Sequence, residues 1–318
     1  MYSWGDNSFW ELGLGSTGVL TPNSPSPVLV SGPTNASWSA IAAGYSASLG
    51  ITTTGQMYGW GLNYSGQLGI NASSNVPNSP VLVSAPAATS FTSVSFGSDG
   101  LFSSALTTTN LIYATGYNNS GQVGINSTTT VSSPIVVQGP YSVSWAAVSA
   151  GSSFSFGITT LGLLYAWGSG TSGDTGINST ANVSSPVLVS GPTGASWSVV
   201  SGGFNHAVGI TTTGLLYAWG YNGLYQLGTL SATSVSSPVL VSGPAGTSWS
   251  TAVANYDASF GITTTGILYG WGLNTSGQLG TNSTTSVSSP VLVSGPAGTS
   301  WASIATGLPI YHSLAITT

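Results

Sequence analysis

Short apolar runs, separated by polar and glycine-rich segments, extend along the whole chain of 318 residues. A representative stretch contains four of them: 215–219, 238–241, a segment that opens at Trp249, and 260–263. Each run is bounded by Gly, Pro, Ser or Thr, and none has the length or the 3.6-residue period of a helix. The pattern therefore predicts short β-strands throughout and an all-β protein.

The four-run pattern recurs along the chain, and its clearest landmark is Tyr-x-Trp-Gly, with one degenerate copy that reads Tyr-Ala-Thr-Gly. Six copies begin 52 to 56 residues apart, at Tyr2, Tyr58, Tyr113, Tyr165, Tyr217 and Tyr269. Repeats of this length with four strands each are typical of a β-propeller, a ring of four-stranded sheets called blades. We therefore predict a single domain over residues 1–318 that forms a six-bladed β-propeller of four-stranded blades.

Two recurring residue types predict how each blade is built. Glycine in a hairpin turn permits positive φ, and it recurs at Gly55, Gly162, Gly214 and Gly266. Proline opens the second of the four apolar runs, Val-Leu-Val in most repeats, at Pro27, Pro80, Pro134, Pro186, Pro238 and Pro290. Because proline is tolerated in sheets mainly at a strand's first residue or on an edge, we expect this strand at the outer rim of each blade.

The two ends of the chain match adjacent parts of one repeat. The last residues, Ile316-Thr317-Thr318, correspond to 210–212, and the first, Met1-Tyr2, correspond to 216–217. The chain is thus interrupted inside a hairpin turn. We expect the C-terminal strand to pair with the N-terminal strand and to close the ring.

Composition supports a folded core and excludes several functions. Hydrophobic residues make up 41% of the chain, with eleven Trp and fourteen Tyr, whereas lysine, arginine and cysteine are absent. Without bases to neutralise phosphates, nucleic-acid binding is excluded, and without cysteine there is no disulfide, thiolate metal site or cysteine nucleophile. No apolar run approaches the roughly twenty residues that span a bilayer, and the N-terminus lacks the pattern of a secretion signal.

The loops after the Trp-Gly landmark permit a family comparison. Residues 61–69 and 272–280 resemble the G-x-N-x-x-G-Q-L-G signature of regulator-of-chromosome-condensation repeats, and 312–317 resembles that family's H-S-x-A-x-T strand. The resemblance covers the whole chain and implies a propeller. The family's namesake is a seven-bladed nuclear protein that binds chromatin and promotes nucleotide exchange on a small GTPase, and many relatives use the repeat as a scaffold. This chain differs from it in having six units and no basic residue.

Few residues are left over for chemistry. His206 and His312 occupy a position where other repeats carry Ala or Phe, which predicts buried, structural histidines. No nucleophile and orienting acid accompany them, so we predict no catalytic residues and no enzyme. Asp99 and Asp257 lie in comparable loops, and a Ca²⁺ site there would need six to eight oxygens. The five carboxylates are therefore expected to be solvated charges, with no metal and no cofactor.

The most informative loops are those that break the repeat's own rule, because a scaffold residue should recur whereas a contact residue need not. Exposed aromatic side chains can stack on sugars or anchor a protein partner. Packing between blades, or sequence drift, is the alternative explanation. The candidate contact residues are Phe9, Trp10, Glu11, Leu224, Tyr225, Tyr256, Asp257 and Tyr311.

Two hypotheses for function follow. The first is a non-enzymatic structural or recognition module on a virion, such as a capsid decoration, fibre or tail component, or on a cell surface. Its partners would be other structural proteins of the particle, surface glycans or a receptor. It is motivated by a composition without trypsin sites and by the absence of a secretion signal. The second is a cytoplasmic protein-interaction scaffold of the chromosome-condensation-regulator type, for example one that acts on a GTPase.

Overall fold

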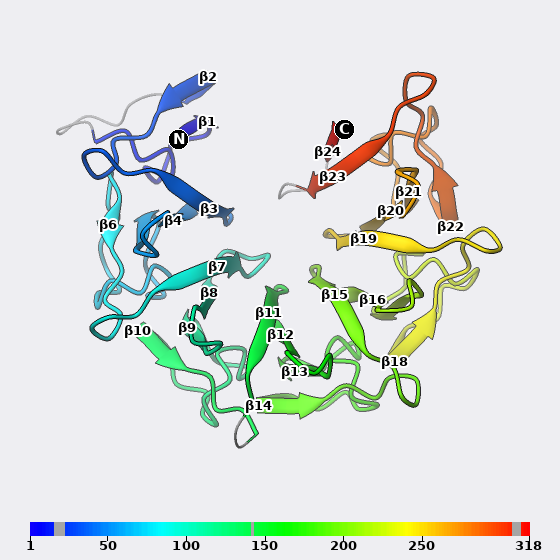
Figure 1. Cartoon of the computed structure of the whole chain (residues 1–318), viewed down its shortest axis with the longest axis horizontal. Helices are drawn as coiled ribbons and strands as arrows, with labels where there is room; N and C mark the ends of the chain where they lie inside the picture. Colours follow the sequence, from blue (N-terminus) through cyan, green and yellow to red (C-terminus); the bar gives the residue numbers. More distant parts are fainter. Residues whose placement is uncertain (16–22, 141–142, 307–312) are drawn as a thin grey trace.

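The structure, a computed structural model, describes residues 1–15, 23–140, 143–306 and 313–318. All of the secondary-structure elements in these ranges are β-strands, twenty-four in number, and they are arranged around a central axis (Figure 1). No helix in the described part of the chain is long and apolar enough to cross a membrane. The predicted all-β propeller is confirmed.

Five sheets contain four strands each, and their hydrogen-bonded order follows the sequence from the axis outwards (Figure 1). They are β3 (Trp38–Ala43), β4 (Ala47–Thr52), β5 (Met57–Gly61) and β6 (Val81–Leu82); β7 (Phe91–Phe96), β8 (Phe102–Thr107), β9 (Ile112–Gly116) and β10 (Val131–Val136); β11 (Trp145–Ala150), β12 (Phe154–Thr159), β13 (Leu164–Gly168) and β14 (Val183–Leu188); β15 (Trp197–Gly202), β16 (His206–Thr211), β17 (Leu216–Gly220) and β18 (Val235–Leu240); and β19 (Trp249–Ala254), β20 (Ala258–Thr263), β21 (Leu268–Gly272) and β22 (Val287–Leu292).

The turn and rim predictions are also confirmed. The glycines of the β4–β5, β12–β13, β16–β17 and β20–β21 turns have φ between 77° and 80°, and Asn110, in the corresponding turn of the degenerate repeat, has φ 60°. The proline-containing strands β10, β14, β18 and β22 lie at the periphery of the ring (Figure 1). The expectation that proline opens the strand is wrong, because each proline is the fourth residue of its strand, where the free edge requires no hydrogen bond from it. Both residue types therefore occur where backbone geometry requires or tolerates them.

The remaining strands form two half-blades at the ends of the chain. One is β1 (Tyr2–Gly5) with β2 (Ser24–Leu29), and the other is β23 (Trp301–Thr306) with β24 (Ser313–Thr317). Among the described residues, β1 pairs only with β2 and β24 only with β23, and the two half-blades stand apart across an opening in the ring (Figure 1). At the curvature of this structure the terminal strands do not meet, so their pairing stays a prediction.

Successive blades are joined by the tryptophan of the landmark. Trp167, Trp219 and Trp271 are completely buried. Each indole nitrogen donates a hydrogen bond to a loop carbonyl of the preceding blade: Trp167 Nε1 to Gln122 O at 2.9 Å, Trp219 Nε1 to Asp174 O at 3.0 Å, and Trp271 Nε1 to Gln226 O at 2.9 Å.

The loop that accepts this indole must approach it closely. A Cβ built on Gly176 would lie 2.8 Å from atoms of the Trp219 ring, and one on Gly124 would lie 2.6 Å from Trp167. Both glycines have positive φ. The final glycine of the G-Q-L-G sequence is therefore required both for the turn and for the fit of the neighbouring blade.

We expect Trp219→Ala to lower the free energy of unfolding by about 3–5 kcal/mol, because it leaves a cavity between blades and removes the hydrogen bond to Asp174. Chemical denaturation followed by circular dichroism measures the change. Ser144→Ala, at an exposed position before β11, is the control and should change stability by less than about 0.5 kcal/mol. A loss of similar size in both variants would contradict this role of the indole.

Candidate interaction face

The connections between strands divide into two ends of the propeller. In an antiparallel blade, the loop between the first and second strands and the loop between the third and fourth strands lie at the same end. Hydrogen bonds confirm this, since Ser169 N donates to Ser153 O at 2.8 Å and Leu273 N donates to Asp257 O at 2.8 Å. The end that carries these loops is called the carboxylate end below, and the opposite end, which carries the hairpin turns 53–56, 108–111, 160–163, 212–215 and 264–267, is called the turn end.

The same loops of successive blades contact one another, which makes the carboxylate end a continuous surface. Ser152 N donates to Gly203 O at 3.0 Å, and Phe204 N donates to Asn255 O at 3.2 Å. All five carboxylates of the chain lie in these loops: Asp6, Glu11, Asp99, Asp174 and Asp257. The hairpin turns at the turn end contain no charged residue. All of the groups that make up the formal charge of −5 therefore lie at one end of the molecule.

The candidate contact residues that the structure describes also lie at the carboxylate end. Phe9, Trp10 and Glu11 follow β1, Leu224 and Tyr225 follow β17, and Tyr256 and Asp257 join β19 to β20. Tyr311 lies outside the described residues. Three positions on different repeats, chosen only because they depart from the repeat pattern, thus share one end of the ring.

Buried amides hold the long loops of this end in shape. Asn222 is fully buried, and its Oδ1 accepts a hydrogen bond from Leu227 N at 2.9 Å while its Nδ2 donates to Ser231 O at 2.7 Å. Gln226 Oε1 accepts from Leu224 N at 2.9 Å. Asn and Gln of the family signature are therefore loop supports, and the residues between them are displayed on a fixed backbone.

Two of the candidates hold an unfavourable backbone conformation. Trp10 and Tyr225 have φ of 64° and 67°. At the same loop position the other repeats carry Gly66, Gly121, Gly173 and Gly277, all with positive φ. An L-residue there costs about 1–2 kcal/mol relative to its preferred conformation. Large aromatic residues are thus present where the scaffold alone favours glycine.

Phe204, Tyr45 and Tyr64 are further aromatic residues at this end, and they were not among the predicted contact residues. Phe204 and Tyr256 stack with ring centroids 3.9 Å apart and planes inclined by 19°. Tyr45 is exposed at the equivalent loop position of another blade, and Tyr64 is exposed in a long loop. The signal that could have identified Tyr45 and Phe204 is their shared position just after the first strand of a blade, where neighbouring repeats carry serine.

The carboxylates differ in their surroundings. Asp6 is exposed, and the Ser8 hydroxyl, which donates to Asp6 Oδ1 at 2.7 Å, lowers the pKa of that carboxyl. Burial raises the pKa of Glu11 and that of Asp257. Burial also raises the pKa of Asp99 to about 6. The exposed and half-buried groups keep a negative field at this end near neutral pH.

Asp174 corrects the expectation that all carboxylates are solvated. Only 3% of its surface is exposed, and burial raises its pKa to about 7. It stands where four other repeats carry Gln, and its shorter side chain reaches Ser172 N only at 3.5 Å, whereas Oδ1 has no partner. Asp174 is thus a poorly satisfied substitution inside the scaffold, and it contributes little charge to the surface.

The histidine prediction can be tested only at His206. Its side chain is fully buried, and its Nε2 lies 2.8 Å from Ser259 Oγ. Because that hydroxyl donates to Gln226 O at 2.8 Å, the imidazole Nε2 is the donor to it. Burial lowers the pKa of His206 to about 3, so the ring is neutral. The predicted interior position is confirmed for His206, and His312 lies outside the described residues.

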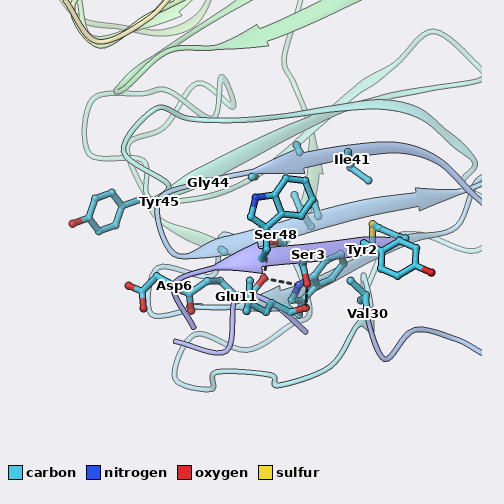
Figure 2. A pocket seen from close by; sticks show the side chains of 17 residues that line it. Tyr2, Ser3, Asp6, Glu11, Val30, Ile41, Gly44, Tyr45 and Ser48 are labelled. Atoms are coloured by element: carbon cyan, nitrogen blue, oxygen red, sulfur yellow. Dashed lines mark hydrogen bonds between the residues drawn. The ribbon is translucent and has the colours of Figure 1, made fainter. Parts of the chain in front are cut away.

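Two cavities flank the opening of the ring. One, of about 320 Å³, lies beside β1 and is lined by side chains that include Tyr2, Ile41 and Trp60. Figure 2 shows Asp6 and Tyr45 projecting at one side of this cavity and Tyr2 and Val30 at the other. The second, of about 370 Å³, lies beside β24. Within the described ranges, no group of three or more His, Cys, Asp or Glu side chains is placed to hold a metal ion.

A family model matches six successive segments of the chain. The regulator of chromosome condensation (RCC1) repeat matches residues 1–51, 54–102, 110–158, 162–210, 213–260 and 265–316. The chain belongs to the RCC1 repeat family. It is thus an RCC1-like propeller.

Individual relatives share the repeat at low identity. The chain is 26% identical over 316 residues to the ultraviolet-B receptor UVR8 of Arabidopsis thaliana, covering 99% of this chain and 70% of the receptor. It is 27% identical to the E3 ubiquitin-protein ligase HERC2 of Mus musculus, covering all of this chain but only 6% of the ligase.

Solved RCC1-type structures agree with the fold. Human WBSCR16 superposes with a TM-score of 0.84 at 22% identity, covering 99% of this chain and 85% of that one. Yeast RCC1 (Prp20), in its complex with Kap60, superposes with a TM-score of 0.81 at 18% identity, covering 100% of this chain and 76% of the other.

Asp174→Gln should stabilise the protein in a pH-dependent way. Since the pKa of Asp174 is raised from 3.8 to about 7 by folding, stability from this group is lost as pH rises from about 4 through 7, by at most about 4 kcal/mol. The variant avoids this loss, so its advantage should grow across that range and level off above it. Urea unfolding of both proteins at pH 4, 6 and 8 measures it.

The comparison isolates the effect of Asp174. The pKa of His206 is lower in the folded protein, so protonation of this histidine lowers stability as pH falls from 6.5 towards 3, but it does so equally in both proteins. A stability difference that stays constant from pH 4 to pH 8 would be incompatible with a buried, proton-binding Asp174.

Proposed function

We propose that this RCC1-type propeller is a non-enzymatic recognition module that binds a protein partner at its carboxylate end, through lysine or arginine side chains of that partner. The supporting observation is the convergence, at this end, of all five carboxylates and of the aromatic residues that break the repeat pattern.

The chemistry of this surface suits a basic protein surface. Asp6 is exposed and ionised. Glu11 is half-buried and lies in the same loop, and Asp257 is half-buried in a loop of another blade. With no lysine or arginine in the chain, none of these carboxylates can be neutralised by an internal base of that kind. An incoming cationic side chain would gain both charge pairing and contact with aromatic faces such as those of Tyr256 and Phe204.

Partners of relatives are consistent with a protein ligand. In one of the solved structures, Kap60 is bound to yeast RCC1 (Prp20), a protein that contains a propeller of this fold. Fold does not fix function, so the partner of this chain follows from its own surface and not from that complex. A small-molecule enzyme site has no comparable support, because the only described histidine is buried and neutral.

The cellular setting is a separate matter. The composition that motivates display on a virion or cell surface, without lysine or arginine, is a property of the sequence alone. The family membership fits a cytoplasmic scaffold equally well. Recognition at the carboxylate end is the part of the proposal that both settings share.

Binding should be separable from folding by returning two contact residues to the repeat's own glycine. The double variant Trp10→Gly and Tyr225→Gly relieves positive φ at both positions, so its melting temperature should equal or exceed that of the original chain. It removes two aromatic anchors from the carboxylate end, so a partner captured by the original chain should bind it at least about tenfold more weakly. Calorimetric unfolding and a surface-binding measurement test the two halves.

The matched control restores the repeat at the opposite end. Leu161 is exposed in a turn-end hairpin where four other repeats carry threonine, and Leu161→Thr should leave partner binding unchanged. If Leu161→Thr abolishes binding while the double glycine variant retains it, the partner binds the turn end and the proposal fails.

The setting can be decided by mass spectrometry. Because the chain offers trypsin no cleavage site, purified particles, surface material and cytosol must be digested with another protease such as chymotrypsin. Recovery among particle or surface proteins is the outcome expected for a displayed module. Absence from every such preparation, with recovery in the cytosol, would leave only the intracellular scaffold.

A further inference from the structure

The first strands of the five complete blades converge on the propeller axis (Figure 1). Where β3, β7, β11, β15 and β19 end, at the carboxylate end, they surround a cavity of about 190 Å³, which is called the axial cavity below. None of the described residues that line it is ionisable, and none belongs to a half-blade. Its lining residues with polar side chains are Ser95, Ser98, Ser149, Ser201 and Asn255.

Three of these serine hydroxyls have a proton to donate. Each is on the fifth residue of its strand, and its oxygen accepts a hydrogen bond from a backbone N–H of the next blade. These bonds join Ala150 N to Ser95 Oγ at 3.0 Å, Gly202 N to Ser149 Oγ at 3.1 Å, and Ala254 N to Ser201 Oγ at 3.1 Å. A hydroxyl that accepts in this way keeps its O–H for another partner. No atom of the described residues accepts that O–H.

Asn255 adds an amide that the scaffold does not require. At its position, directly after the first strand, the other complete blades carry Gly44, Gly97, Gly151 and Gly203. Only 4% of Asn255 is exposed, and within the described part of the chain its Nδ2 has no hydrogen-bond partner. A buried amide without a partner is unfavourable for folding. Since rotation about χ2 lets either end of the amide face the cavity, a ligand there can supply the missing bond.

The charges at the mouth of the axial cavity restrict the ligand. Asp99 directly follows Ser98, and Asp257 lies two residues after Asn255, so carboxylates of two blades border the cavity. With no lysine or arginine in the chain to offset them, an anionic ligand is repelled. The groups left unpaired inside are mainly hydrogen-bond donors, which an ammonium or guanidinium group, itself only a donor, does not match. The cavity therefore favours a neutral ligand that carries several oxygen acceptors.

Size and apolar contacts narrow this class to sugars. A volume of about 190 Å³ corresponds to roughly six water molecules of about 30 Å³ each, which is the size of one sugar ring with its hydroxyls. Tyr256 directly follows Asn255, and Phe204 lies two residues after Gly202, which also lines the cavity. These two rings stack with centroids 3.9 Å apart, and both are partly exposed. An aromatic face beside a set of hydroxyls complements the C–H face and the hydroxyls of a sugar.

We propose that the axial cavity binds one neutral sugar unit, to whose oxygens the hydroxyls of Ser95, Ser149 and Ser201 donate. The Asn255 amide pairs with a further sugar hydroxyl, which can both donate and accept. The hydrogen bonds of this site come from neutral groups beneath the surface, whereas the protein-binding surface proposed above relies on carboxylates and on Trp10 and Tyr225. Neither binding event therefore requires the other.

Saturation-transfer difference NMR with the full chain tests the site. The probes are the methyl glycosides of glucose, galactose, mannose and N-acetylglucosamine, with methyl glucuronide as the anionic counterpart of the first. We expect saturation transfer from the protein to at least one of the four neutral glycosides. Methyl glucuronide should receive none, because Asp99 and Asp257 repel its carboxylate. Titration of the responding glycoside gives its dissociation constant.

The double variant Ser149→Ala with Ser201→Ala removes two of the donors. Ala42 occupies the same strand position in β3, so the scaffold accepts alanine there. We expect the dissociation constant of the responding glycoside to rise at least about tenfold, since two hydrogen bonds to the ligand are lost. Ser198→Ala is the matched control: Ser198 lies on the same strand as Ser201 but towards the turn end, and its hydroxyl donates to Ile210 O at 3.1 Å. It should bind the glycoside as the original chain does.

Three results would overturn the proposal: no transfer to any neutral glycoside, equal transfer to methyl glucuronide, or undiminished binding by a double alanine variant with native circular dichroism. If that variant does not fold, amide spectra of the original chain decide. Glycoside-induced shifts at Ala150, Gly202 and Ala254, whose N–H groups bond to the three hydroxyls, support the site, and shifts confined to the turn end contradict it. The variant Trp10→Gly with Tyr225→Gly should bind the glycoside normally, so sugar binding and partner binding can fail separately.

Discussion

The hydrogen bond from the landmark indole to a loop carbonyl of the preceding blade is the interaction on which the ring depends. Trp60, Trp167, Trp219 and Trp271 form it, and in the degenerate repeat the Thr115 hydroxyl donates to Gly66 O at 3.0 Å instead. Where an indole is present, the accepting loop requires a glycine because no Cβ fits beside the ring. With no lysine or arginine to form ion pairs of the usual kind, neighbouring blades are held by this bond, by aromatic packing such as Phe156 against Trp219, and by backbone hydrogen bonds. The tryptophan of Tyr-x-Trp-Gly therefore recurs in five of the six repeats because it packs against the neighbouring blade.

This constraint also determines which residues are free to vary. The second and third strands of a blade are buried between neighbouring blades, and the Asn and Gln side chains of the long loops form hydrogen bonds that hold the loops in shape. What remains are the exposed loop positions at both ends. The hairpin turns at the turn end contain no charged and no aromatic residue, whereas the loops at the carboxylate end carry charge and aromatic rings. Recognition is thus assigned to one end because variation of that kind is concentrated there.

Much of this architecture could be predicted from the sequence, because each repeat copies its strand, turn and proline positions. Pro238 at the rim and Gly214 in its turn are examples for which backbone geometry alone suffices. The environments of individual carboxylates could not be predicted, since Asp174 becomes buried only through contact with another blade, 45 residues away in the case of Trp219. Phe204 was missed because its stacking on Tyr256 joins two loops 52 residues apart. Tertiary neighbours, which no local pattern records, determine both.

The candidate contact residues illustrate the same division. Their departure from the repeat was visible in the sequence, but their position at one end of the ring required the strand order. The positive φ of Trp10 and Tyr225, which separates them from ordinary drift, required the backbone.

Zero-length carbodiimide cross-linking of the chain to a captured partner tests recognition at the carboxylate end most directly. The reagent joins carboxylates to amines, and because the chain has no lysine, its Asp and Glu side chains can react only with the partner's lysines or with a chain terminus. Since all five lie at one end, the account predicts cross-links from Asp6 and Asp257 to lysines of the partner. A partner that stays bound but forms no cross-link to any of the five carboxylates, while its lysines remain reactive towards other carboxylates, would contradict it.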